Sequence, residues 1–111
     1  MSRPTEAFED IVQAILSVTR PAAVVLFGSH ARGDARADSD IDLLVVREQD
    51  FAPGESRRHE LGAIYRAAAR ARAVPKDIIL LTKPEFMEWR STRNHMASVA
   101  WKEGRLLYGK V

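Results

Sequence analysis

Three aspartates and a glycine–serine pair are the residues of this sequence whose types and spacing can do chemistry. Asp40 and Asp42 stand at alternate positions where an apolar segment begins, and Asp77 directly precedes another apolar segment. Carboxylates at alternate positions of a strand point to the same face, with Cα atoms about 6–7 Å apart. Their oxygens can bind a hard cation such as Mg²⁺, which chemistry at phosphate groups requires.

The glycine–serine pair supplies the second half of such a site. Gly28 and Ser29 follow an apolar segment and open a polar loop that ends at Ser39. Glycine lets the backbone pass close to a phosphate, and an adjacent serine can donate a hydrogen bond to it. The stretch from Phe27 to Val46 therefore predicts a combined nucleotide and metal site.

The three carboxylates are marked by the sequence to different degrees. Asp42 lies inside the apolar segment 41–46, where an ionised side chain is costly unless it has a ligand. Asp40 is also compatible with a turn or cap, and Asp77 with an ordinary charge at a strand entrance. If the two strands are neighbours, the carboxylates converge and repel one another unless cations intervene. This favours bound Mg²⁺ or Mn²⁺, as two ions about 3.5–4 Å apart.

Helices and strands alternate along the chain and would position these residues. Apart from Asp42, segment 41–46 is apolar at every position, which predicts a central strand buried on both faces. The loop 28–39 is expected to hold a single helical turn near 29–32, and Gly104 to end the last helix as a C-terminal glycine. We expect an α/β fold in one domain, residues 1–111, with a small mixed β-sheet flanked by helices. The predicted helices are 4–19, 56–73, 85–90 and 94–103, and the predicted strands are 22–27, 41–46, 78–81 and 105–108, the last at the sheet's edge.

Composition sets the broad class of the protein. The 111 residues are 46% hydrophobic and 29% charged, which is typical of a soluble globular domain with a modest core. No apolar run is long enough to span a bilayer, and the first residues do not form a signal peptide. The absence of cysteine excludes disulfides and thiolate zinc sites. We expect a cytoplasmic protein with no membrane association.

Charge is unevenly distributed along the chain. Residues 34–50 contain six acids and two bases, whereas residues 55–76 contain six bases and two acids. The acidic part suits a metal site beside a surface that tolerates polyanions. The basic helix 56–73 has no interleaved aromatic residues, so direct nucleic-acid binding is not expected. A solvated or partner-facing surface is favoured for it, and its role stays open.

The spacing of the motif matches a known family. Gly28-Ser29, ten further residues and then Asp40-Ile41-Asp42 resemble the signature of the DNA polymerase beta-like nucleotidyltransferase superfamily. The fuller run from Gly28 to Val45 is similar to its minimal nucleotidyltransferase (MNT) branch. The similarity continues through Asp77 and on to 103–108, so it covers nearly the whole chain. It implies the nucleotidyltransferase fold.

The resemblance also implies a role for each matching residue. Nucleotide binding would fall to Gly28, Ser29 and Arg32, and metal binding and catalysis to Asp40, Asp42 and Asp77. Within this set Asp77 would join the metal that activates the acceptor hydroxyl and serve as its base. Arg32 fits the family's Ala-Arg-Gly segment and could reach a phosphate, although an exposed structural arginine fits as well.

MNT proteins are typically the antitoxin of a module whose toxin is a HEPN-domain ribonuclease. The resemblance therefore implies a Mg²⁺-dependent enzyme that transfers AMP from ATP to a tyrosine hydroxyl of that toxin, in a hetero-oligomer. The chain has little length for a substrate-binding domain, which disfavours transfer to a small molecule or RNA. An antitoxin that neutralises its toxin by binding alone is the main alternative. The nucleotide, the acceptor residue and the oligomeric state stay open.

Overall fold

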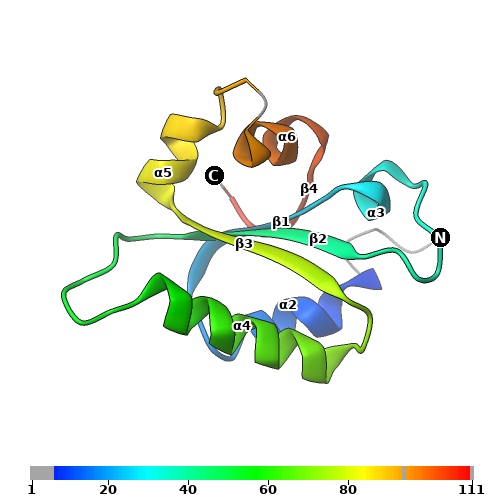
Figure 1. The fold of residues 1–111 in the computed structure, drawn as a ribbon, viewed down its shortest axis with the longest axis horizontal. Helices are drawn as coiled ribbons and strands as arrows, with labels where there is room; N and C mark the ends of the chain where they lie inside the picture. Colours follow the sequence, from blue (N-terminus) through cyan, green and yellow to red (C-terminus); the bar gives the residue numbers. More distant parts are fainter. Residues whose placement is uncertain (1–6, 94, 111) are drawn as a thin grey trace.

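A four-stranded mixed sheet organises the computed structural model, which describes residues 7–93 and 95–110 (Figure 1). The strand order is β3-β2-β1-β4, with β2 parallel to β3 and β1 antiparallel to both β2 and β4. The predicted mixed sheet, the central position of segment 41–46 and the edge position of the last strand are thus confirmed. The strands are β1 (Pro21–Phe27), β2 (Ile41–Arg47), β3 (Lys76–Thr82) and β4 (Arg105–Gly109).

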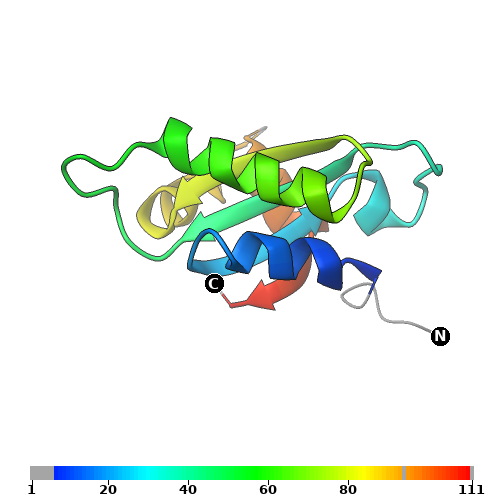
Figure 2. The same cartoon turned by 90° about the horizontal axis from the view of Figure 1, so that it is seen from below.

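Two pairs of helices cover the two faces of the sheet. In Figures 1 and 2, α2 and α4 lie side by side on one face, whereas α5 and α6 lie on the other. A one-turn helix, α3, follows β1, as the sequence predicted. The helix expected over 4–19 spans a shorter segment, and its residues 4–6 lie outside the described part. The helices are α2 (Glu9–Leu16), α3 (Ser29–Arg32), α4 (Arg57–Ala71), α5 (Lys83–Trp89) and α6 (Met96–Glu103).

The alternation of side chains along β2 separates two apolar cores. Leu43 and Val45 pack under α2 and α4, and Leu44 and Val46 pack under α5 and α6. A strand that is buried on both faces has no polar positions in its middle, which explains its continuous apolar sequence. Asp42 is two residues before Leu44 and therefore shares the face covered by α5 and α6.

Side-chain caps and one ion pair fix the start of α5. Thr82 accepts a hydrogen bond from the backbone N–H of Glu85, and the Glu85 carboxylate accepts one from the N–H of Thr82. Arg57 of α4 donates to both Glu85 oxygens, at 2.8 and 2.6 Å, and to the Leu80 carbonyl. These bonds join α4, β3 and α5 at one end of the sheet.

Gly104 ends α6, as the sequence predicted. Its φ of −73° is ordinary, so no left-handed C-terminal conformation is used. A Cβ at this position would instead lie 2.1 Å from the Ala100 carbonyl oxygen and 2.5 Å from Cγ1 of Val25. Glycine is needed here because the chain passes tightly between α6 and β1.

Candidate active site

Asp42 and Asp77 lie side by side on the neighbouring parallel strands β2 and β3. They are register partners, so their Cα atoms are about 4.8 Å apart and their side chains leave the same face. Asp40 directly precedes β2 and is exposed, as is Asp77, whereas Asp42 is half-buried. The structure thus places Asp42 beside Asp77 where β2 and β3 begin, with Asp40 near enough for its charge to raise the pKa of Asp42.

Gly28 lies directly against the carboxylate of Asp42. Its φ is +74°, a left-handed conformation that favours glycine, and a Cβ built on it would lie 2.1 Å from Oδ2 of Asp42. In the β1–β2 register, Phe27 is opposite Asp42. The two halves of the sequence motif, Gly-Ser and Asp-x-Asp, therefore lie next to each other in the fold.

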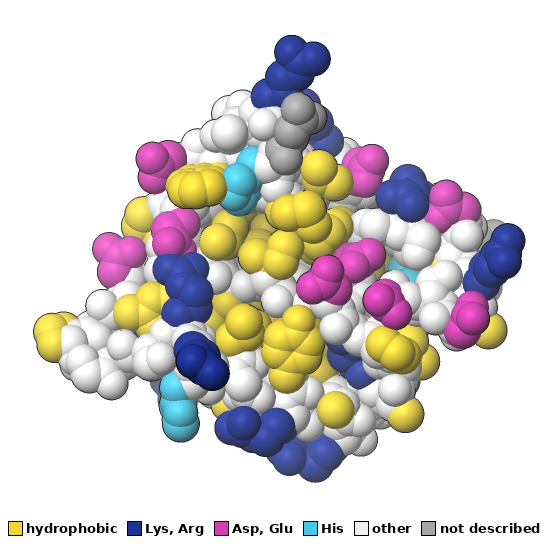
Figure 3. Space-filling view, in the orientation of Figure 1, with side chains coloured by type: hydrophobic (Ala, Val, Ile, Leu, Met, Phe, Trp, Pro, Cys, Tyr) yellow, Lys and Arg dark blue, Asp and Glu magenta, His cyan; other side chains and the backbone are white. Residues whose placement is uncertain are grey.

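The electrostatics of the cluster are unfavourable in the absence of a cation. Burial raises the pKa of the Asp42 carboxyl above its usual value, and the charges of Asp77 and Asp40 raise it further. His30 and Arg32 oppose this rise but do not cancel it. Figure 3 shows acidic side chains gathered near the right-hand ends of β2 and β3 as Figure 1 draws them. This is the charge pattern of a site that accepts cations.

The donor set fits Mg²⁺ as a partial ligand set. Across residues 7–93 and 95–110, no three His, Cys, Asp or Glu side chains are grouped closely enough to enclose a metal by themselves. Mg²⁺ rarely needs such an enclosure, because it is usually held by one or two carboxylates together with substrate phosphates and water. Asp42 and Asp77 match that kind of site, because they are adjacent and the Asp77 side chain is exposed to solvent.

Two of the predicted nucleotide-binding residues, Ser29 and Arg32, lie on α3, and Gly28 directly precedes it. Ser29 is the first residue of α3, immediately after Gly28. Arg32 ends the helix and pairs with two carboxylates: its Nε is 3.4 Å from Asp34 and its Nη1 is 3.5 Å from Glu103. The positive charge of Arg32 also lowers the pKa of Asp42. The two carboxylates that Arg32 contacts, those of Asp34 and Glu103, are not part of the aspartate cluster.

Three contacts around the site involve residues that the sequence reasoning did not select. The His30 ring, through Nε2, is 3.1 Å from the Ser39 carbonyl oxygen, which connects α3 to the residue before Asp40. The Tyr65 hydroxyl accepts from the N–H of the residue after Asp77 and donates to its carbonyl. Arg105 of β4 donates from Nε to the Ala31 carbonyl at 2.8 Å. No local pattern marks these contacts, because each joins positions far apart in the sequence.

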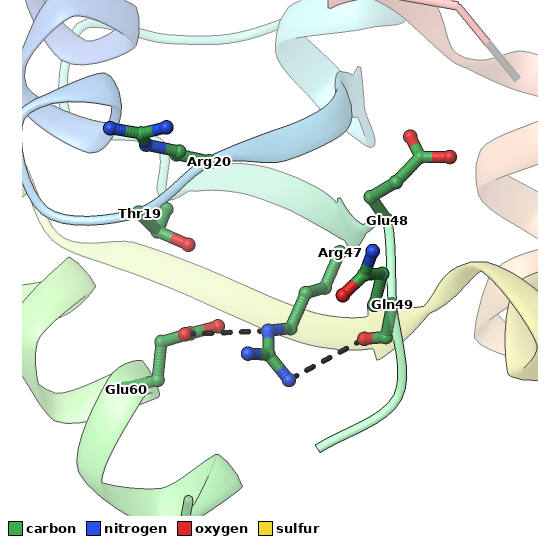
Figure 4. Close-up of a pocket in the computed structure, with 6 residues that line it drawn as sticks. All are labelled: Thr19, Arg20, Arg47, Glu48, Gln49 and Glu60. Atoms are coloured by element: carbon green, nitrogen blue, oxygen red, sulfur yellow. Dashed lines mark hydrogen bonds and ion pairs between the residues drawn. The ribbon is translucent and has the colours of Figure 1, made fainter. Parts of the chain in front are cut away.

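A separate hollow of about 490 Å³ lies at the other end of β2 (Figure 4). Arg47 at its centre pairs with Glu60 and donates to the Gln49 carbonyl. Arg47 is five residues along β2 from Asp42, or roughly 16 Å. None of the predicted site residues lines this hollow, and its central Arg47 is already paired with Glu60. The carboxylate cluster is therefore the better candidate for catalysis.

Comparisons with known proteins point to the same chemistry. The model of the nucleotidyltransferase domain family matches residues 6–108. A protein of Methanocaldococcus jannaschii, provisionally named a protein adenylyltransferase, is 44% identical over 48 residues. That alignment covers 41% of this chain and 48% of the relative, so the match spans about half of the relative's length.

Solved structures share the fold at low sequence identity. A toxin–antitoxin complex with AMP-PNP contains a chain with a TM-score of 0.67 and 18% identity, covering 92% of this chain and 73% of that one. A chain from a variant of the toxin–antitoxin MntA–HpeT has a TM-score of 0.65 and 16% sequence identity. The match covers 92% of this chain and 72% of that chain. The variant replaces two aspartates, two positions apart, with glutamates.

Proposed function

Since the chain belongs to the nucleotidyltransferase domain family, we propose that it transfers AMP from ATP to a hydroxyl side chain of another protein. The acceptor is a tyrosine of a HEPN-type toxin, and the chain acts as the antitoxin. This proposal follows the sequence resemblance to the MNT branch. The provisional name of the archaeal relative and the toxin–antitoxin context of the two solved structures support it.

One observation carries the proposal: Asp42 is placed between Gly28 and Asp77. The carboxylate touches the glycine that opens the phosphate-binding segment and is the register partner of the aspartate on the next strand. A nucleotide with its phosphates at Gly28 and Ser29 would then have its reacting phosphorus beside the carboxylates. The paired aspartates replaced in the MntA–HpeT variant have the same spacing as Asp40 and Asp42.

In the proposed reaction some residues bind the nucleotide and another accepts a proton. Gly28 and Ser29 bind the phosphates, and Arg32 exchanges its carboxylate partners for a phosphate. The acceptor oxygen attacks the α-phosphorus, the bond to the bridging oxygen breaks, and pyrophosphate leaves. Asp77 takes the proton of the hydroxyl, because it is exposed on the strand next to Asp42 and stands at the open side of the cluster.

Mg²⁺, for which Mn²⁺ can substitute, would be held by Asp40, Asp42 and Asp77. When bound, it supplies positive charge for the leaving pyrophosphate and the attacking oxygen. The raised pKa of Asp42 agrees with this role, since a carboxylate repelled by its neighbours gains most from a cation.

A protein acceptor also suits the surface beside the site. Four large apolar side chains of α5 and α6 are between 42% and 48% exposed, namely Met87, Trp89, Met96 and Trp101. These helices cover the sheet face to which Asp42 and Asp77 belong, and Figure 3 shows hydrophobic side chains exposed over them. Exposed aromatic and methionine side chains are enriched at protein interfaces.

The test is an incubation of the chain with its HEPN-type partner, ATP and Mg²⁺, followed by mass spectrometry of the partner. We expect the partner to gain one or more AMP units on tyrosine. The Asp40→Asn/Asp42→Asn variant should fold and leave the partner unmodified. An Asp38→Asn variant, changed in the same loop but outside the cluster, should behave as the wild type.

The same experiment separates the alternatives. Equal protection by wild type and double variant, without any mass gain, would establish neutralisation by binding alone. Transfer of label from ATP to RNA or to a small molecule, with the partner protein unmodified, would instead show that the acceptor is not a protein. A panel of labelled nucleoside triphosphates in the same assay identifies the nucleotide.

A further inference from the structure

The junction between α6 and β4, Glu103–Gly104–Arg105, contacts the helix that follows the phosphate-binding glycine. Arg105 donates from Nε to the Ala31 carbonyl at 2.8 Å, across 74 sequence positions. Glu103 lies 3.5 Å from Nη1 of Arg32. The C-terminal part of the chain thus reaches both the backbone and the cationic side chain of α3.

This junction is held firmly against the sheet. Gly104 donates to the Ala100 carbonyl at 2.8 Å, and no space for a Cβ remains between Ala100 and Val25. In the β1–β4 register, Arg105 is opposite Leu26, two residues before Gly28. The position of Arg105 is therefore set by the same strand that delivers Gly28 to the site.

In contrast, α3 depends on tertiary contacts for its stability and its position. It is a single turn of four residues, too short to be stable without tertiary contacts. Its terminal carbonyls lack partners within the helix, and a cation at a helix C-terminus is favourable. The Arg105 guanidinium supplies both the donor and the charge, while the Ala31 side chain is buried beneath it in the core.

We propose that Arg105 is a positioning residue for the nucleotide site. By holding the Ala31 carbonyl it places α3, and with it Ser29 and Arg32, against the carboxylate cluster. The inference rests on the proposed function, because it takes α3 to be the element that receives the nucleotide phosphates. It adds a residue that the Gly-Ser and Asp-x-Asp motif does not contain.

Glu103 has the opposite effect on the same helix. Arg32 is shared between Asp34 and Glu103, and the three side chains are 46%, 63% and 42% exposed. Ion pairs this exposed are weak, so the phosphates of a nucleotide can displace them. Glu103 thereby competes with the nucleotide for Arg32 and lowers the affinity of the protein for the nucleotide.

The test measures the binding of AMP-PNP with Mn²⁺ by calorimetry, without an acceptor. Arg105→Met should raise the Kd about tenfold, the value of one charge-assisted hydrogen bond. Arg105→Lys, which can still donate to the carbonyl, should recover most of the affinity. Lys110→Met, just beyond β4 and away from α3, is the matched control. Arg105→Gln replaces the methionine variant if that variant does not fold.

Glu103→Gln should change the Kd in the other direction. We expect binding about two- to fivefold tighter at low salt, with the gain lost at high ionic strength. A lower thermal stability of Arg105→Met with an unchanged Kd would reduce Arg105 to a structural residue and overturn the inference. Weaker binding by Glu103→Gln would overturn the competition for Arg32. Absence of nucleotide binding by the wild type would instead count against the proposed function itself.

Discussion

Replacing Asp42 with asparagine should stabilise the metal-free protein while removing a proposed catalytic carboxylate. Asp42 is half-buried beside Asp77 and near Asp40, and both charges raise its pKa. At neutral pH the ionised side chain therefore lowers the stability of the fold. Asparagine keeps the size of the side chain and removes the charge, so the repulsion disappears without a cavity.

The size of the effect follows from Coulomb's law. Two unit charges about 6 Å apart, at an effective dielectric constant between about 40 and 80, repel by roughly 0.7–1.4 kcal/mol. Arg32 offsets part of this repulsion, since its charge lowers the pKa of Asp42. We expect a net gain of about 1 kcal/mol, or about 4–8 °C in Tm for a domain of this size.

Thermal unfolding in EDTA and in Mn²⁺ measures the prediction. In EDTA the variant should melt at the higher temperature, whereas Mn²⁺ should stabilise the wild type more than the variant. Because the folded-state pKa of Asp42 is raised above its ordinary value of 3.8, the wild type regains stability as the pH falls through that pKa. The difference between the two proteins should therefore shrink on acidification.

An Asp38→Asn variant is the control, since Asp38 is exposed in the loop that leads into β2. It should change the Tm little in either buffer. A destabilised Asp42→Asn protein in EDTA, or an equal gain for Asp38→Asn, would refute the claim that the carboxylates repel one another at this site.

Three further outcomes are expected. Gly28→Ala places a methyl group where the Asp42 carboxylate lies and should lower the rate of AMP transfer about 100-fold, measured with labelled ATP. Tyr65→Phe removes a hydroxyl bonded to both backbone groups of one residue in β3 and should cost about 1–2 kcal/mol in urea denaturation. Hydrogen bonding to Arg57 lowers the pKa of Glu85, so stability should fall as the pH drops below its ordinary value of 4.5. A Glu85→Gln variant should show a smaller loss over the same pH range.

Several features of the fold could be predicted because they depend on neighbouring residues. The apolar run 41–46 indicated a strand buried on both faces, and it lies inside the sheet between β3 and β1. The cap at the start of α5 is local in the same way, since Thr82 and Glu85 are three residues apart. Gly104 ends α6 as predicted, but its close packing against β1 is a tertiary property that the local sequence does not contain.

The basic helix 56–73 shows how partners decide the role of a charged segment. Two of its arginines are engaged structurally: Arg57 pairs with Glu85, and Arg72 pairs with Asp10 of α2. From the sequence only an excess of positive charge could be recognised, because Glu85 is 28 positions from Arg57 and Asp10 is 62 positions from Arg72.

By itself the sequence determined the alternation of elements and the chemical types of the site, since residue spacing fixes which carboxylates share a strand face. Only the tertiary structure decided that Asp42 touches Gly28, that Asp77 is its register partner, and that Arg105 reaches Ala31. These contacts depend on strand order and register, which arise when distant segments bury their apolar faces together. The contacts that join β1, β2, β3, β4 and α3 around the site therefore become visible only when the chain is folded.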